Sequence, residues 1–199
     1  MKPMSGDNKP LDYKFYGIGR RYENVTLATL DTSEEAYQTI LDYASNIAQN
    51  LDKGLGLILK GPVGTGKTCA AIAVMRAALA NKRSAYFISM VSLLDKLLTL
   101  RDKEESYVFE QRLRTTPLLV LDDLGGEYRG KSDESWTRRK IASVIADRYD
   151  SRLSTIITTN LTVEQLKVEY DERMIDRLRS TNRLITLGGA SLRHPEWRG

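Results

Sequence analysis

Apolar residues follow two alternating patterns along the chain. In the first pattern, short runs are apolar almost throughout, which is typical of strands buried on both faces of a parallel sheet. Strands are therefore predicted at 55–60, 85–89, 118–123, 154–160 and 184–187. In the second pattern, apolar residues recur at helical spacing over longer stretches. Helices are predicted at about 34–51, 67–81, 135–152, 162–170 and 171–180, with a long helical zone at 90–115.

The alternation of strands with helices predicts the fold class. We expect an α/β protein of three layers, in which a five-stranded parallel sheet is covered by helices on both faces. The helix after residue 34 should bury one face, made of Ala36, Ile40, Tyr43, Ala44 and Ile47. The helix after residue 135 should bury Ile141, Val144, Ile145 and Tyr149. Residues 1–21 contain chain breakers and several aromatic residues, so they are predicted to form an N-terminal arm that partly packs on the domain.

The segment Gly61–Thr68 fits the phosphate-binding pattern G-x-x-x-x-G-K-T. It lies between a predicted strand and a predicted helix, where a P-loop must lie, and this context disfavours a glycine-rich turn that matches by chance. Glycines let consecutive N–H groups face a phosphate, and the helix N-terminus adds partial positive charge. ATP is expected to bind through Val63, Gly64, Thr65, Gly66, Lys67 and Thr68.

Polar residues end two of the predicted strands. Asp122 ends the strand at 118–123, at the sheet edge where ligands of α/β proteins bind, and with the Thr68 hydroxyl it is expected to hold Mg²⁺. Asp123 is the candidate group that orients or deprotonates the attacking water. Asn160 ends the next strand and is expected to help place this water. The alternative for the aspartate pair is a turn cap.

Composition narrows the classes of function. The 199 residues, 41% hydrophobic and 28% charged, predict one globular domain. A net charge of +4 permits a polyanionic partner without requiring one. One cysteine (Cys69) and one histidine (His194) are too few for an internal disulfide, a zinc site or a Ser-His-Asp triad. The longest apolar helix is too short to span a membrane and no signal-peptide core occurs, so we expect a cytoplasmic protein.

Two groups of basic residues are candidates for further roles. Arg173 and Arg177 lie four positions apart, on one face of a predicted helix. Such arginines supply positive charge to a γ-phosphate, in some proteins that of a neighbouring subunit. The alternative is that they form ion pairs with nearby acids. The helical zone 90–115 is longer than a crossover requires. Its Lys96, Arg101 and Arg112 are expected to bind single-stranded DNA, and a solvated helix face is the alternative.

Four motifs in this order resemble a known family. They are G-x-x-G-x-G-K-T at 61–68, L-x-L-D-D-L-G at 119–125, S-T-I-I-T-T-N at 154–160 and E-R-x-x-D-R-L-R at 172–179. Together they resemble the DnaC/DnaI-type helicase loaders and the related IstB-type helper ATPases of insertion sequences. Both are AAA+ proteins of the initiator clade, and the resemblance covers about residues 20–194.

The resemblance implies roles and partners. Asn160 matches sensor 1, Arg177 the arginine finger that acts on a neighbour's ATP, and Arg193 the sensor-2 arginine. It implies an AAA+ domain over residues 22–199 that hydrolyses ATP with Mg²⁺ and forms head-to-tail rings or spirals. The residues Tyr22–Leu27 match a segment that lines the adenine pocket, and the inserted helices match an element that contacts single-stranded DNA.

The family comparison also leaves alternatives. Relatives usually carry an N-terminal partner-binding domain and a C-terminal helical lid, whereas here about 20 residues precede the core and the lid is expected to be reduced. A replicative helicase is the expected partner of a loader, and a transposase that of an IstB-like helper. Two other hypotheses remain: a P-loop small-molecule kinase, and a non-catalytic module that presents a surface to a partner.

Overall fold

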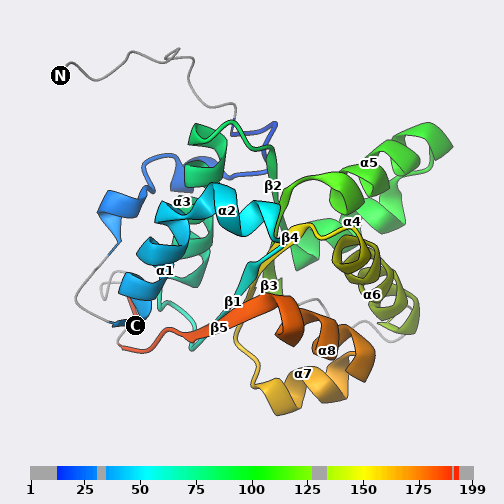
Figure 1. Cartoon of the computed structure of the whole chain (residues 1–199). Coiled ribbons are helices and arrows are strands. Elements are labelled where there is room, and N and C mark those ends of the chain that lie inside the picture. The colour runs from blue at the N-terminus through cyan, green and yellow to red at the C-terminus, as the bar shows by residue number, and fades with distance from the viewer. Residues whose placement is uncertain (1–12, 31–34, 127–133, 190, 193–199) are drawn as a thin grey trace, which may run out of the picture.

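The computed structural model describes residues 13–30, 35–126, 134–189 and 191–192 (Figure 1). Its centre is a five-stranded parallel sheet with the strand order β2-β3-β4-β1-β5. The strands are β1 (Gly56–Lys60), β2 (Ala85–Ser89), β3 (Leu118–Leu124), β4 (Ser154–Thr159) and β5 (Asn182–Thr186). The predicted fold class is confirmed, and the predicted strands match within about two residues at each end.

Helices cover both faces of the sheet, as predicted (Figure 1). One face carries α1 (Glu35–Ser45), α2 (Ile47–Asp52) and α3 (Lys67–Ala80), together with the short 3₁₀ turns η1 (Arg20–Tyr22) and η2 (Leu27–Thr29). The other carries α4 (Met90–Thr99), α5 (Lys103–Thr115), α6 (Glu134–Asp150), α7 (Val163–Glu169) and α8 (Glu172–Thr181). Among these residues, no helix has the length and apolar composition that crossing a membrane requires.

The apolar core is divided by the sheet into two parts. Alternate residues of a strand point to opposite faces, so Leu57 and Leu59 of β1 pack with α1 and α3, whereas Ile58 packs with the helices of the other layer. The helix α3 is apolar on nearly every side, and Ala70–Met75 are all fully buried. The helix that follows the P-loop is therefore packed into the core along most of its length.

The structure corrects one residue of the predicted core and divides one predicted helix, whereas the zone 90–115, in which a second piece was expected from about residue 105, does form two helices. In α6, Tyr149 is 41% exposed, whereas Arg148 is 1% exposed. One residue turns a helix by about 100°, so the inward position after Ile145 belongs to Arg148 and Tyr149 points outward. The helix expected to run to residue 51 breaks at Asn46, and the zone 90–115 breaks at residues 100–102, where Asp102 caps α5 through the Glu105 N–H.

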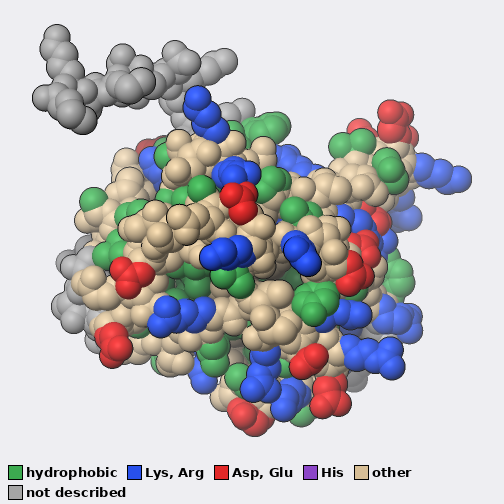
Figure 2. Space-filling view, in the orientation of Figure 1, with side chains coloured by type: hydrophobic (Ala, Val, Ile, Leu, Met, Phe, Trp, Pro, Cys, Tyr) green, Lys and Arg blue, Asp and Glu red, His purple; other side chains and the backbone are tan. Residues whose placement is uncertain are grey.

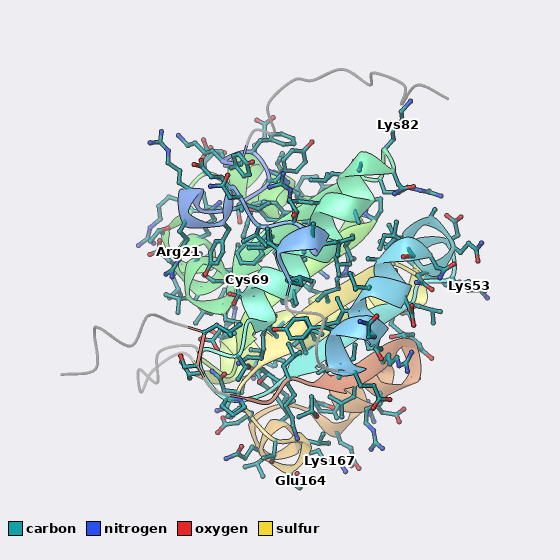
Figure 3. All side chains as sticks on the ribbon, turned by 90° about the vertical axis from the view of Figure 1, so that its left-hand side faces the viewer. Arg21, Lys53, Cys69, Lys82, Glu164 and Lys167 are labelled. Atoms are coloured by element: carbon teal, nitrogen blue, oxygen red, sulfur yellow. The ribbon has the colours of Figure 1, made fainter. Side chains whose placement is uncertain are left out.

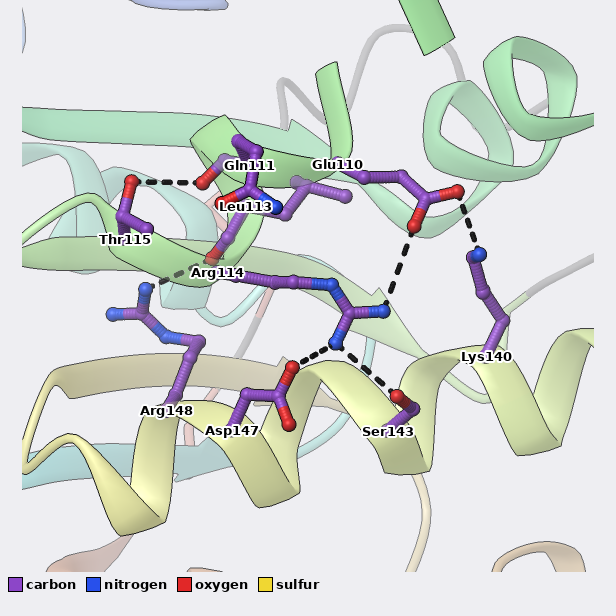
Figure 4. A network of polar contacts seen from close by, with 9 residues as sticks. All are labelled: Glu110, Gln111, Leu113, Arg114, Thr115, Lys140, Ser143, Asp147 and Arg148. Atoms are coloured by element: carbon purple, nitrogen blue, oxygen red, sulfur yellow. Dashed lines mark hydrogen bonds and ion pairs between the residues drawn. The ribbon is translucent and has the colours of Figure 1, made fainter. Parts of the chain in front are cut away.

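Polar contacts join α5 to α6 (Figure 4), and Arg148 of α6 also contacts the start of β4. The buried Arg148 guanidinium donates to the carbonyl oxygens of Leu113, Thr116 and Ser154, at 2.9, 2.8 and 2.5 Å, and to the Thr155 hydroxyl at 2.9 Å. Burial lowers the pKa of Arg148 to about 9. Closer to the surface, Arg114 pairs with Glu110 and Asp147, and Lys140 pairs with Glu110. The orientation of α6 is therefore fixed by hydrogen bonds as well as by apolar packing.

The described part of the N-terminal arm packs on the domain, as expected from its aromatic residues. Ile18 is buried in the core, and the Tyr16 carbonyl accepts a hydrogen bond of 2.9 Å from the Phe87 N–H at the edge of β2. The guanidinium of Arg76 in α3 lies over the Tyr13 ring. The arm therefore packs along β2 and α3, and its residues Arg21 and Tyr22 form one wall of the cleft described below. The predicted reduced lid falls mainly on residues outside the described ranges.

Candidate nucleotide-binding site

The P-loop connects β1 to α3 at the carboxyl edge of the sheet. Gly66 caps α3 in a left-handed conformation, with φ = 80°, and a Cβ atom at this position would lie 2.5 Å from the Tyr37 hydroxyl. That hydroxyl donates a hydrogen bond of 3.0 Å to the Thr65 carbonyl oxygen. Glycine is required here on both counts, because a side chain would strain the backbone and collide with α1. Helix α1 thereby holds the loop in place.

Lys67 is held toward the end of β4. Its ammonium group is largely buried and donates to the Gly61 and Pro62 carbonyl oxygens, at 2.8 and 2.7 Å. It also donates to Asn160 Oδ1 at 2.7 Å, and Asn160 Nδ2 donates to Asp123 Oδ1 at 3.0 Å. The three side chains that were predicted for the site, Lys67, Asn160 and Asp123, therefore form one continuous chain of hydrogen bonds.

Asp122 lies on the other side of the same edge. Its Oδ1 atom accepts hydrogen bonds from the Thr68 hydroxyl, at 2.9 Å, and from the Thr158 hydroxyl, at 2.7 Å. Burial raises the pKa of Asp122, while the two hydroxyl donors oppose this change. Hydroxyl and carboxylate oxygens are the hard ligands that Mg²⁺ prefers. The donor set of Thr68 and Asp122 therefore fits the expected magnesium site.

Both aspartates face one cleft although they are consecutive in a strand. Regular strands turn neighbouring side chains to opposite faces. Here the register of β3 against β4 shifts between Leu121 and Leu124, and Asp123 has a left-handed φ of 62°. The distortion re-aims the second carboxylate to the side of the first. The two acids thus point to the same space, where separate roles in metal and water binding are geometrically compatible.

The cleft has a volume of about 800 Å³. Its walls come from the arm, the P-loop, the ends of β3 and β4, and the segment after β5. The lining residues are Arg21, Tyr22, Val63, Gly64, Gly66, Lys67, Thr68, Cys69, Asp122, Asp123, Thr158, Asn160 and Leu192. Most of the predicted site residues are therefore brought together, and the volume is in the range of small-molecule and cofactor sites.

Four wall residues were not identified as site residues from the sequence: Arg21, Cys69, Thr158 and Leu192. Arg21 and Cys69 lie on the same side of the molecule (Figure 3), and Leu192 reaches the P-loop because its N–H donates to the Gly64 carbonyl oxygen at 2.9 Å. Burial raises the pKa of the Cys69 thiol, with Arg21 opposing the change. The half-buried Cys69 thiol therefore lacks the lowered pKa that is typical of a nucleophilic cysteine. Hydrophobic pattern and spacing give no signal for Arg21 or Leu192, and the family resemblance pointed only to their neighbours Tyr22 and Arg193.

Comparison with known proteins then identifies the family. A family model described as IstB-like ATP binding protein matches residues 27–198. The chain belongs to this family. It is 28% identical over 197 residues to the replicative helicase loader DnaI of Bacillus subtilis (strain 168), an alignment that covers 89% of the chain and 60% of the relative. The chain thus spans less than two thirds of that protein's length.

Solved structures agree with this assignment. A crystal structure of the DnaC helicase loader superposes with a TM-score of 0.74 at 29% identity, over 85% of this chain and 99% of that one. A structure of the replication initiator DnaA bound to AMPPCP and single-stranded DNA superposes with a TM-score of 0.69 at 18% identity, over 83% of this chain and 50% of that one. The second likeness concerns the fold alone. The fold of this IstB-like protein is therefore that of the AAA+ proteins.

Arg173 and Arg177, both on α8, do not line the cleft. Arg177 is half-buried on α8, and its guanidinium carbon lies 6.0 Å from the centre of the Tyr149 ring. Within the described residues, none of the ion pairs involves Arg173 or Arg177, and Glu169 pairs instead with Arg138 at 2.6 Å. Arg193 lies outside the described residues. The expectation that Arg177 acts on another subunit therefore remains a prediction.

Two basic residues of the inserted helices, the half-buried Arg112 and the exposed Lys96, lie over aromatic rings. The Arg112 guanidinium lies between the Phe15 and Tyr86 rings, 4.5 and 4.0 Å from their centres, and donates to the Phe15 carbonyl oxygen. Lys96 lies over the Phe109 ring. Arg101 and Lys103, at the start of α5, are exposed. Figure 2 shows basic side chains interspersed with acidic ones on one face, including at the projecting end of this insert.

Proposed function

We propose that this IstB-like protein is a Mg²⁺-dependent ATPase that acts on single-stranded DNA, in the manner of a DnaC/DnaI-type helicase loader. The observation that carries the proposal is the chain of hydrogen bonds from Lys67 through Asn160 to Asp123, in the same cleft as the Thr68–Asp122 pair. A P-loop lysine, a metal-binding pair and a water-activating group are the parts that ATP hydrolysis needs.

Each residue has a distinct part in the proposed reaction. The P-loop N–H groups and Lys67 bind the triphosphate, with Lys67 at the β- and γ-phosphates. Thr68 and Asp122 would hold Mg²⁺, which when bound neutralises negative charge on the phosphates. Asp123 orients the attacking water and accepts its proton, and Asn160 holds Asp123 through the 3.0 Å hydrogen bond. Water attacks the γ-phosphorus, and the bond to the β-phosphate oxygen breaks to give ADP and phosphate.

Hydrolysis is tested by comparing two conservative variants. We expect Asp123→Asn to bind ATP as the wild type does and to lose hydrolysis, because the amide cannot accept the proton of water. Asp150→Asn is the matched control, since Asp150 is an exposed aspartate at the end of α6 outside the cleft. The proposal falls if the wild-type protein with Mg²⁺ and single-stranded DNA releases no phosphate, or if Asp123→Asn is as active as the wild type.

We also propose that a neighbouring copy of the chain completes the catalytic site by placing its Arg177 at the bound ATP. Heterologous contacts of this kind give rings or open spirals. Arg177→Ala should bind ATP but lose hydrolysis, and mixing it with Lys67→Ala protein should restore part of the activity. Arg179→Ala, an exposed arginine of the same helix, is the control. The absence of rescue, together with full activity of Arg177→Ala alone, would contradict this assignment.

The partner distinguishes the two forms of the proposed function. The relative DnaI is named a replicative helicase loader, which favours a replicative helicase, whereas the family match favours an IstB-type helper that works with a transposase. The ATP-locked Asp123→Asn protein, immobilised and exposed to host lysate, should retain one of these two partners. DNA binding should be salt-sensitive and should depend more on the exposed Arg101 and Lys103 than on Arg112, whose guanidinium is stacked between two rings.

A further inference from the structure

The distortion of β3 places two residues opposite one residue of β4. In the pairing of these strands, Leu121 lies opposite Ile157 and Leu124 lies opposite Thr159. Asp122 and Asp123 therefore both face the single position of Thr158. A bulge of this kind leaves the backbone ladder incomplete, so some other group must satisfy the displaced polar atoms.

The side chain of Thr158 is that group. Its hydroxyl accepts a hydrogen bond of 2.8 Å from the Asp123 N–H and donates one of 2.7 Å to Asp122 Oδ1. A hydroxyl has one proton, and here the Asp123 N–H uses its acceptor side, so the proton is directed to Asp122. Thr158 is 1% exposed, which leaves little access for water to replace either bond.

From these contacts we infer that Thr158 is a positioning residue for both acids, holding the Asp122 carboxylate for the metal and the Asp123 backbone for the water-activating carboxylate. This inference rests on the proposed ATPase function. The hydrogen bond to Oδ1 fixes the rotation of the Asp122 carboxylate, and the bond from the Asp123 N–H holds the left-handed residue that re-aims its side chain. One buried hydroxyl thereby couples metal binding to water activation.

The same strand provides a matched control. Thr155 is also a buried threonine of β4, and its hydroxyl also accepts a hydrogen bond, from Arg148 Nε at 2.9 Å. Unlike Thr158, Thr155 does not line the cleft. Replacing either residue by valine keeps the shape of the side chain and removes buried hydrogen bonds, two at Thr158 and one at Thr155. The pair therefore separates a loss of packing or stability from a loss of positioning.

The experiment measures Mg²⁺ requirement and turnover in wild-type protein, Thr158→Val, Thr158→Ser and Thr155→Val. Binding of a fluorescent ATP analogue is titrated with Mg²⁺, and kcat and KM are measured separately. Loss of a residue that orients a metal ligand typically reduces metal affinity or activity by about 10- to 100-fold. We expect Thr158→Val to need about tenfold more Mg²⁺ and to lose kcat more than KM, and we expect Thr158→Ser to restore both. Thr155→Val should lower the unfolding temperature and leave the Mg²⁺ requirement unchanged.

The outcomes separate this inference from the proposed function. If the wild type hydrolyses ATP and Thr158→Val matches it in Mg²⁺ requirement and kcat, the inference is wrong and the ATPase function stands. If the wild type binds the analogue without hydrolysing it, the ATPase proposal fails and the Mg²⁺ titration still decides the role of Thr158. An equal effect of Thr155→Val would show that the role is merely structural. Should Thr158→Val fail to fold, Thr158→Cys, whose thiol is a weak donor, carries the same comparison against Thr158→Ser.

Discussion

Replacing Gly126 by alanine should displace chiefly the Asp123 carboxylate. A Cβ atom at residue 126 would lie 2.3 Å from Asp123 Oδ2 and 2.6 Å from Asp123 Cγ, much closer than the ordinary contact distance. The backbone of Gly126 does not have the left-handed conformation that penalises a side chain, so the effect comes from this collision. The carboxylate must therefore retreat, whereas the Asp123 carbonyl oxygen, 3.0 Å from the added Cβ, needs to shift much less.

The size of the retreat gives the expected loss of activity. Ordinary van der Waals distances require the carboxylate oxygen to move by about 1 Å. Because Cγ also lies too close, at 2.6 Å, the whole carboxylate moves, and with it Oδ1, which accepts the 3.0 Å hydrogen bond from Asn160 Nδ2. This bond should be lost, because hydrogen bonds weaken rapidly beyond that length. A misplacement of about 1 Å in an active site costs about 10²-fold in rate, equivalent to about 2.7 kcal/mol in the activation free energy. The contacts of Lys67, Thr68 and Asp122 are unchanged, so ATP affinity should be retained.

The assay is single-turnover ATP hydrolysis, accompanied by titration with a fluorescent ATP analogue. Gly188→Ala is the matched control, since among the described residues no atom lies within 4 Å of a Cβ at that position. Wild-type hydrolysis by Gly126→Ala, measured beside an unaffected control, would refute the idea that Asp123 must be held where the structure shows it. Loss of nucleotide binding along with hydrolysis would equally refute it, because the predicted damage is confined to the water-activating group.

Three further predictions concern other parts of the site and the fold. Lys67→Ala should abolish detectable nucleotide binding in the same titration. EDTA should do the same in the wild type, which is expected to bind ATP as its Mg²⁺ complex. Tight binding in both cases would contradict the proposed nucleotide-binding site. Tyr37→Phe removes the 3.0 Å hydrogen bond to the Thr65 carbonyl and should lower the free energy of unfolding by about 1 kcal/mol in urea titrations, an effect that bound nucleotide should not abolish. Arg148→Met leaves its buried acceptors without a donor and should lower that free energy by about 3 kcal/mol, whereas a neutral result would mean that the desolvation of the guanidinium offsets its hydrogen bonds.

The sequence alone was sufficient for the fold class and for much of the cleft. The P-loop is a local pattern, because one glycine-rich turn joins a strand to the helix whose N-terminus binds the phosphates. Asp122 and Asn160 follow apolar runs at the carboxyl ends of β3 and β4, and parallel strands end at one edge of the sheet, so the proximity of the two residues follows from the alternation of elements. These predictions depend on spacing and period, which are properties of short segments.

Only the tertiary structure decided how these groups are held. The role of Thr158 depends on a register shift between β3 and β4, and the buried position of Arg148 in place of Tyr149 depends on which way α6 is turned against the sheet. Likewise, the sequence predicted that Arg112 is available to bind DNA, but its guanidinium stacks against the ring of Phe15, 97 residues away in the chain. Register, helix rotation and such distant contacts arise from packing of the whole core, where each side chain's environment is set by residues far from it in sequence.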